Sequence, residues 1–109
     1  MRFLSIPVIA ALLFSALACA QQADEQLLKE AIAEHQAGRM DAAIAGYEKY
    51  LALHPEAPQA LSNLGAAYAR AGRYSDAIAQ YRKALKLQPG NVPVAVSYTH
   101  LTLPTNREV

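Results

Sequence analysis

The chain has 109 residues and a formal net charge of +1, which is room for one small domain and too little charge to attract nucleic acid or an acidic membrane. Its single cysteine, Cys19, excludes an intramolecular disulfide, and its three scattered histidines lack the ligand spacing of a zinc site. We therefore expect no metal, no cofactor, no nucleic-acid partner and no small-molecule substrate.

The first twenty residues, MRFLSIPVIAALLFSALACA, have the layout of a secretory signal peptide. Arg2 supplies the positive start, residues 3–18 carry no charge, and Ala18-Cys19-Ala20 forms a small-x-small cleavage site. The uncharged run is shorter than the ~20 apolar residues that span a membrane. The segment 1–20 therefore predicts an exported protein, periplasmic or secreted, that is cleaved after Ala20. An uncleaved N-terminal anchor is the alternative.

Cys19 allows a different processing step. The run SALAC resembles the lipobox of lipoproteins loosely, since Ala16 stands where Leu is usual and Leu17 lies beside it. Lipidation of Cys19 would tether the mature chain to a membrane, to which it would have no other anchor. We favour ordinary cleavage, which discards Cys19, and keep the lipoprotein as the alternative.

After the leader, the sequence repeats itself with a period of 34 residues. Residues 37–56, AGRMDAAIAGYEKYLALHPE, align with residues 71–90, AGRYSDAIAQYRKALKLQPG, and eleven of the twenty pairs are identical. We assign residues 24–57 to a first unit and residues 58–91 to a second unit. Internal repetition at this period is typical of stacked supersecondary units.

Each unit has the periodicity of two helices. In the first unit we expect helices from about Glu25 to Ala37 and from Asp41 to His54, ended by Pro55. In the second unit, two apolar stripes with helical spacing are separated by Gly72, which can adopt the positive φ of a tight helix–helix turn. These stripes are formed by Leu61, Leu64, Gly65 and Tyr68, and then by Tyr74, Ala77, Ile78, Tyr81, Ala84 and Leu85.

The second unit resembles the tetratricopeptide repeat family. The resemblance rests on Leu61, Leu64, Gly65, Tyr68, Gly72, Tyr74, Ala77, Tyr81, Ala84 and Pro89. It implies an all-α, tetratricopeptide-like solenoid of two helix-turn-helix units, in which small residues let the helices approach and tyrosines fill the core. The expected core tyrosines are Tyr47, Tyr68, Tyr74 and Tyr81. The first unit matches less well, as expected for a terminal repeat that faces water on one side.

The resemblance also implies a non-catalytic protein that binds a peptide or a partner helix along a concave groove. No phosphate-binding loop or nucleophile elbow is present, so we expect no enzyme activity. Asn63 and Arg70 are the strongest single candidates, because both offer hydrogen-bond donors. The expected groove residues are Leu28, Ile32, His35 and Gln36 from the first unit, and Gln59, Ser62, Asn63, Ala66 and Arg70 from the second.

Charge is divided unevenly between the units. Residues 24–57 hold three basic and seven acidic side chains, whereas residues 58–91 hold five basic and one acidic. Head-to-tail association or a basic groove for an acidic partner would explain this division. We favour complementary contact between the two units themselves, with solvated outer faces.

The repeat pattern stops after Asn91. The stretch VPVAV could begin a third unit, but from about Ser97 the helical register is lost and β-branched residues favour a strand. We therefore expect residues 92–109 to be a broken third unit or a disordered, artefactual tail. The string VSYTHLTLPTNREV resembles the translated read-through of a sequencing-library adapter.

If that resemblance holds, the chain is a fragment of a longer array, because about three units are usually needed to bury a continuous core. The alternative to a free-standing binding module is then an N-terminal repeat appendage of a larger enzyme, or of a lipid-anchored envelope assembly factor.

The leader generates a testable prediction. Because Ala18-Cys19-Ala20 fits a signal-peptidase site better than a lipobox, mass spectrometry of the mature protein should find a free Gln21 at the N-terminus. A diacylated Cys19 would contradict ordinary cleavage and establish the lipoprotein.

Overall fold

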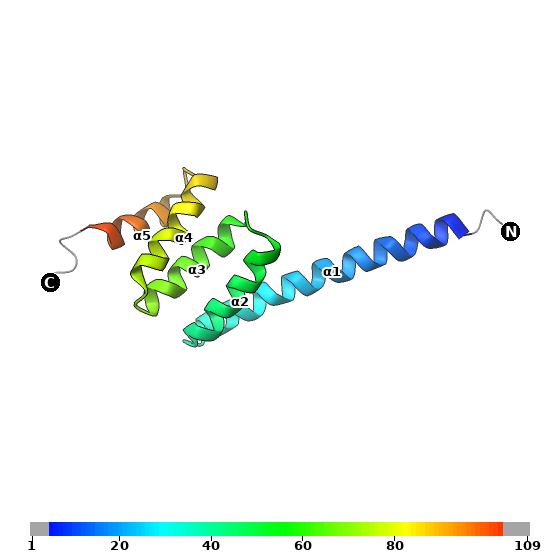
Figure 1. The fold of residues 1–109 in the computed structure, drawn as a ribbon, viewed down its shortest axis with the longest axis horizontal. Helices are drawn as coiled ribbons and strands as arrows, with labels where there is room; N and C mark the ends of the chain where they lie inside the picture. Colours follow the sequence, from blue (N-terminus) through cyan, green and yellow to red (C-terminus); the bar gives the residue numbers. More distant parts are fainter. Residues whose placement is uncertain (1–4, 104–109) are drawn as a thin grey trace.

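A computed structural model of the chain describes the backbone of residues 5–103 and the side chains of residues 14–103. Within these residues the fold consists of helices and turns without strands, which confirms the predicted all-α class. The helices lie in chain order as a series of neighbouring pairs, with α1 extending away from the stack as a long arm (Figure 1). They are α1 (Ser5–Gln36), α2 (Met40–Leu53), α3 (Pro58–Arg70), α4 (Tyr74–Leu87) and α5 (Val92–Thr102).

Two equivalent glycines make the turns inside the units. Gly38 between α1 and α2 has φ 84°, and Gly72 between α3 and α4 has φ 80°. Each turn closes with a backbone hydrogen bond that spans five residues, from the Arg39 N–H to the Glu34 carbonyl at 2.9 Å and from Arg73 to Tyr68 at 2.8 Å. The positive φ predicted for Gly72 is therefore confirmed. Such short turns bring the two helices of each unit side by side in antiparallel directions.

The core runs through the whole stack and uses mainly small and aromatic side chains. α1 packs on α2, α2 on α3, α3 on α4 and α4 on α5, so each helix contacts its sequence neighbours. Burying these apolar side chains is the main stabilising contribution to such a fold. The buried residues of the core are Ala31, Ala43, Ile44, Tyr47, Leu61, Leu64, Ala67, Tyr68, Ala77, Tyr81, Ala84 and Val94.

Glycine lets the helices approach closely in both units. A Cβ placed on Gly65 would lie 2.8 Å from the ring of Tyr81. In the first unit the corresponding position is Ala31, and the glycine lies on the opposite helix instead. A Cβ on Gly46 would lie 2.8 Å from the Cβ of Ala31. The two units thus meet the same spatial requirement with glycines on different helices.

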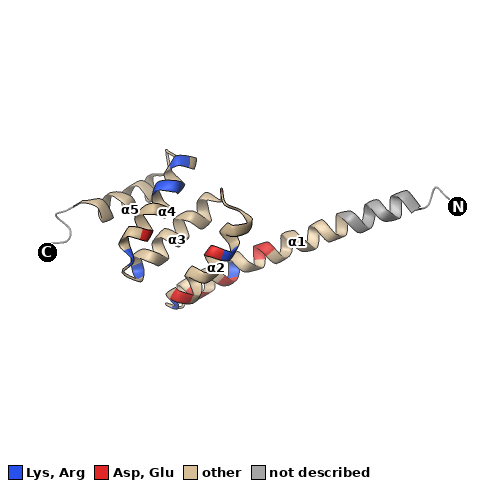
Figure 2. Ribbon diagram, in the orientation of Figure 1, with Lys and Arg blue, Asp and Glu red and all other residues tan. Residues whose placement is uncertain are grey.

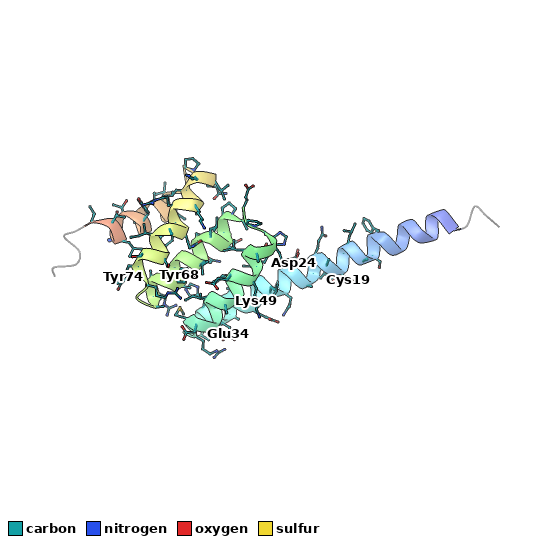
Figure 3. The ribbon with its side chains drawn as sticks, viewed as in Figure 1. Cys19, Asp24, Glu34, Lys49, Tyr68 and Tyr74 are labelled. Carbon is teal, nitrogen blue, oxygen red and sulfur yellow. The ribbon has the colours of Figure 1, made fainter. Side chains whose placement is uncertain are left out.

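One of the four expected core tyrosines is not in the core. Tyr47, Tyr68 and Tyr81 are buried, but Tyr74 is 51% exposed. Tyr74 is the first residue of α4, immediately after the turn at Gly72, so it lies at the edge of the helix pair where no neighbouring helix covers it (Figure 3). Helical periodicity places Tyr74 on the apolar stripe, but it does not show where the packing partner ends.

The first helix begins twenty residues earlier than the predicted start at Glu25. Residues 14–22 consist of Ala, Leu, Gln, Phe, Ser and Cys without Pro or Gly, so nothing in that stretch breaks the helix. Phe14 and Leu17 are 76% and 64% exposed, which places this part of α1 outside the core. Cys19 lies on the same exposed arm (Figure 3). In the described part of the chain, no helix combines the length and the apolar character needed to cross a membrane.

The strand preference predicted from Ser97 onward is wrong, because α5 continues to Thr102. The Asn91 side chain caps this helix by accepting a hydrogen bond from the Val94 N–H at 3.3 Å. Val94 is buried, and Tyr98 and Leu101 pack against the core at helical spacing. Packing on α4 and the cap therefore outweigh the local β propensity.

The buried face of α5 also keeps the 34-residue register. Val94, Tyr98 and Leu101 correspond to Ala60, Leu64 and Ala67 of α3. Residues 92–102 thus occupy the position of the first helix of a third unit. Residues 104–109, the end of the string that resembles an adapter, lie outside the described residues.

We expected the acidic first unit and the basic second unit to contact each other through their opposite charges. The ion pairs of the structure do not support this interpretation. Acidic positions gather along α1 and α2 in Figure 2. However, the three ion pairs among the described residues, Arg39–Glu34, His54–Asp24 and Arg73–Asp76, each join side chains of a single unit. The opposite charges of the two units therefore remain largely at the surface.

The close contact at Gly65 predicts a specific loss of stability. Gly65→Ala should lower the free energy of unfolding by about 1–3 kcal/mol, because the new methyl group would overlap the Tyr81 ring in a packed core. Denaturant unfolding of the full chain measures the loss. Gly90→Ala is the matched control, since a Cβ there meets nothing within 4 Å. Equal effects of the two substitutions would contradict the packing role of Gly65.

Candidate functional site

An open hollow lies where the two units meet, and we call it the inter-unit hollow. It encloses about 270 Å³. α1 and α3 supply most of its wall and α2 supplies its floor, so its shape depends on how the two units stack. Its lining residues are Ile32, His35, Gln36, Tyr47, Asn63 and Arg70.

The structure brings together five of the nine residues that the sequence assigned to a groove, namely Ile32, His35, Gln36, Asn63 and Arg70. The other four do not line the hollow. Leu28 packs against the core, Ala66 is half-buried, Gln59 is exposed, and the Ser62 hydroxyl donates to the Gln59 carbonyl of its own helix at 2.9 Å. The hollow thus lies between the last turns of α1 and the face of α3 that carries Asn63 and Arg70.

Tyr47 is a lining residue that the sequence assigned only to the core. Its side chain is 1% exposed, but its hydroxyl lies 3.0 Å from Nδ1 of His35. The two rings meet edge to face, with centroids 5.9 Å apart. Periodicity locates a tyrosine ring but not the end of its hydroxyl, so no sequence signal could have found this contact.

Arg70 connects the two units across the hollow. Its Nη1 donates to the backbone carbonyl of His35 at 3.2 Å. This bond uses one of the five N–H donors of the guanidinium, and Arg70 remains exposed. Among the described residues, the side-chain amide of Asn63 forms no hydrogen bond to another protein group. Both side chains therefore retain donors for a ligand.

The surroundings of His35 favour its neutral form. Partial burial, and then the positive charge of Arg70, lower the pKa of His35 from its ordinary value of 6.5. The neighbouring Glu34 forms a two-point ion pair with Arg39, whose second contact is 3.0 Å long. With His35 neutral, Arg70 is thus the charged side chain among the residues that line the hollow.

A second polar contact between the units joins α2 to α3. The Tyr68 hydroxyl donates to Glu48 Oε1 at 2.5 Å, and the Arg73 guanidinium lies 4.5 Å from the centre of the Tyr68 ring. Burial and the bond to Glu48 raise the pKa of Tyr68 to about 12, so its hydroxyl stays protonated as a donor. This contact fixes α2 against α3, and with it the spacing of the walls.

Paired antiparallel helices, stacked unit on unit around small-residue contacts, define a helical repeat protein. The tetratricopeptide repeat family model matches residues 28–92, more than half of the chain, and the protein belongs to this family. The match includes every residue that lines the inter-unit hollow. Such repeats commonly mediate protein–protein interactions and are generally non-catalytic. A comparison with curated proteins finds no match.

The environment of His35 predicts a pH dependence of stability. Between pH 6.5 and its lower folded pKa, the unfolded chain binds more protons at this residue than the folded chain does. The stability contributed by neutral His35 is therefore present above pH 6.5 and is lost as pH falls through this window. Urea unfolding at a series of pH values should show this loss, and His35→Gln should reduce it. A loss that is unchanged in His35→Gln but abolished in His54→Gln would contradict the assignment.

Proposed function

We propose that the protein is an exported, non-catalytic binding module that holds a peptide or a partner's helix in the inter-unit hollow. The observation that carries this proposal is the convergence of Ile32, His35 and Gln36 from one unit with Asn63 and Arg70 from the next. Such a surface joins an apolar wall to hydrogen-bond donors, which suits an amphipathic or extended peptide.

The energetics of the site favour a binding role. The helices that carry the lining residues are fixed by the buried core and by the contact of Tyr68 with Glu48. A wall that is ordered before the ligand arrives loses little conformational entropy on binding. The free donors of Asn63 and Arg70 can pair with peptide carbonyl or carboxylate oxygens, while Ile32 contacts apolar groups.

Export is part of the same proposal and rests on the sequence of residues 1–20. The exposure of Phe14 and Leu17 supports it, because removal of this arm would leave the core intact. We place the mature protein in the periplasm or outside the cell. In this proposal, contact with a membrane occurs only through the leader or through a lipidated Cys19.

Selection from a random peptide library tests the binding role. Peptides that bind the full chain should lose about fivefold or more in affinity for Asn63→Ala and for Arg70→Ala, as expected when a central contact is truncated. Fluorescence anisotropy measures the change. Arg82→Ala is the matched control, because Arg82 is exposed on α4 and does not line the hollow. Peptides that bind all four proteins equally would place the binding surface elsewhere.

A further inference from the structure

The turns that join one helix pair to the next lie on one edge of the stack, which we call the turn edge (residues 49–57 and 82–91). α2 ends at Leu53 and α4 ends at Leu87. Because α3 starts at the first of these turns and α4 runs back beside it, the end of α4 lies close to the start of α3. Figure 1 shows both turns on the same edge, opposite the turns at Gly38 and Gly72.

Each turn of this edge exposes a leucine at the same position of the repeat. Leu53 and Leu87 are 34 residues apart in the sequence and are 56% and 40% exposed. An open hollow of about 480 Å³ lies at the first turn. Its lining residues are Tyr50, Leu53, His54, Pro55, Glu56 and Ala57. The edge therefore carries both an exposed apolar side chain and a hollow that such a side chain can enter.

The turn after α4 is basic. Arg82, Lys83 and Lys86 are exposed in the last turns of α4, and none of them belongs to an ion pair among the described residues. Lys and Arg positions gather at this end of α4 in Figure 2. In the first unit, the positions equivalent to Arg82 and Lys86 are Glu48 and Ala52. The same place in the repeat thus differs in charge between the two units.

The turn after α2 is acidic. Glu56 is exposed in the turn itself, and Glu25 is exposed on α1. Asp24, next to Glu25, contacts His54 at 2.9 Å, which places this part of α1 beside the end of α2. Lys49 is the basic side chain at this end of α2, and the acidic groups outnumber it. Opposite charges that share an edge without pairing within the chain favour a complementary surface on another molecule.

We propose that two copies of the chain associate through the turn edge about a twofold axis, with the basic turn of each copy against the acidic turn of the other. A twofold axis makes the same contact twice, so both turns of each copy are used. Lys86 of each copy faces Glu56 of the other, and Leu87 enters the hollow at the first turn. No residue of the turn edge lines the inter-unit hollow, so this association is separate from the proposed peptide binding.

The chemistry of this surface predicts a weak dimer that depends on salt. Exposed leucines with a few charged pairs are typical of small, transient interfaces, which bury less than about 1,200 Å². Salt screens exposed charges, since the Debye length falls from about 10 Å at 0.1 M to about 3 Å at 1 M. We therefore expect dimers at about 200 μM chain in about 50 mM salt, and monomers in about 500 mM salt.

Sedimentation equilibrium of the full chain measures the association, and two charge reversals test the arrangement. Lys86→Glu or Glu56→Lys alone should weaken the dimer at least about tenfold, because each reversal creates like-charged contacts at both turns. An equimolar mixture of the two variants should recover the dimer, since every contact then joins opposite charges. Asp41→Lys is the matched control, because it makes the same charge change as Glu56→Lys at the other end of α2 and should keep the dimer.

Recovery in the mixture requires both variants to be folded, so unfolding cannot imitate the expected result. A chain that stays monomeric at low salt would overturn the proposal, and so would two weakened variants that do not recover when mixed. A dimer that neither reversal weakens would assign the contact to another face, such as the exposed arm with Phe14 and Leu17. Species larger than a dimer would overturn the twofold arrangement, because they indicate an open head-to-tail contact.

Discussion

The separation of the two helices in each unit is the constraint on which the rest of the structure depends. At its closest points, an added methyl group would lie 2.8 Å from the facing side chain, so only glycine fits there. This separation seats Tyr81 beside α3 and brings Tyr47 of α2 close enough to α1 for its hydroxyl to reach His35. The packing of the core and the geometry of the hollow are thus consequences of the same close approach.

Polar contacts accompany the apolar packing both within the first unit and between the units. Inside a unit the helices meet through alanine, glycine and tyrosine rings, and in the first unit His35 also contacts the Tyr47 hydroxyl. Across the boundary, side-chain hydrogen bonds from Tyr68 to Glu48 and from Arg70 to the His35 carbonyl accompany the apolar contacts. Hydrogen bonds are directional, whereas apolar contact is not, so these bonds restrict how one unit can rotate on the other. The hollow lies at this boundary and takes its shape from that restriction.

Most of the fold could be predicted from the sequence because it repeats. The identical pairs at a spacing of 34 residues located the helices of both units to within a few residues, except for the start of α1, and Gly72 marked its turn. The exposure of Tyr74 and the full length of α5 were not predicted, since each depends on whether a neighbouring helix is present. Tyr74 belongs to the apolar stripe of α4 but has no helix packed over it. In α5, packing on α4 and the Asn91 cap stabilise a helix in residues that prefer strands.

Part of the site could be predicted as well. Position within the repeat identified five residues of the hollow, since first-helix positions recur on the same face. The roles of Tyr47 and of the Arg70 bond to the His35 carbonyl could not be found in this way. They depend on where long side chains end across a boundary between units, which a linear pattern does not record. The close contact at Gly46 was not predicted either, because this glycine lies on α2, whereas the glycine of the second unit, Gly65, lies on the first helix of its unit.

The unbroken course of α1 would matter for a chain that is cleaved after Ala20, as we propose. Cleavage after Ala20 would create a new helix terminus at Gln21, where backbone N–H groups lose their partners and the charged α-amino group lies at the positive end of the helix dipole. Asp24 and Glu25 would then fall in or next to the first turn, where negative side chains offset both effects. Asp24 is also held by His54 at 2.9 Å. The residues just after Ala20 are thus suited to begin a helix, although in the full chain they lie in the middle of one.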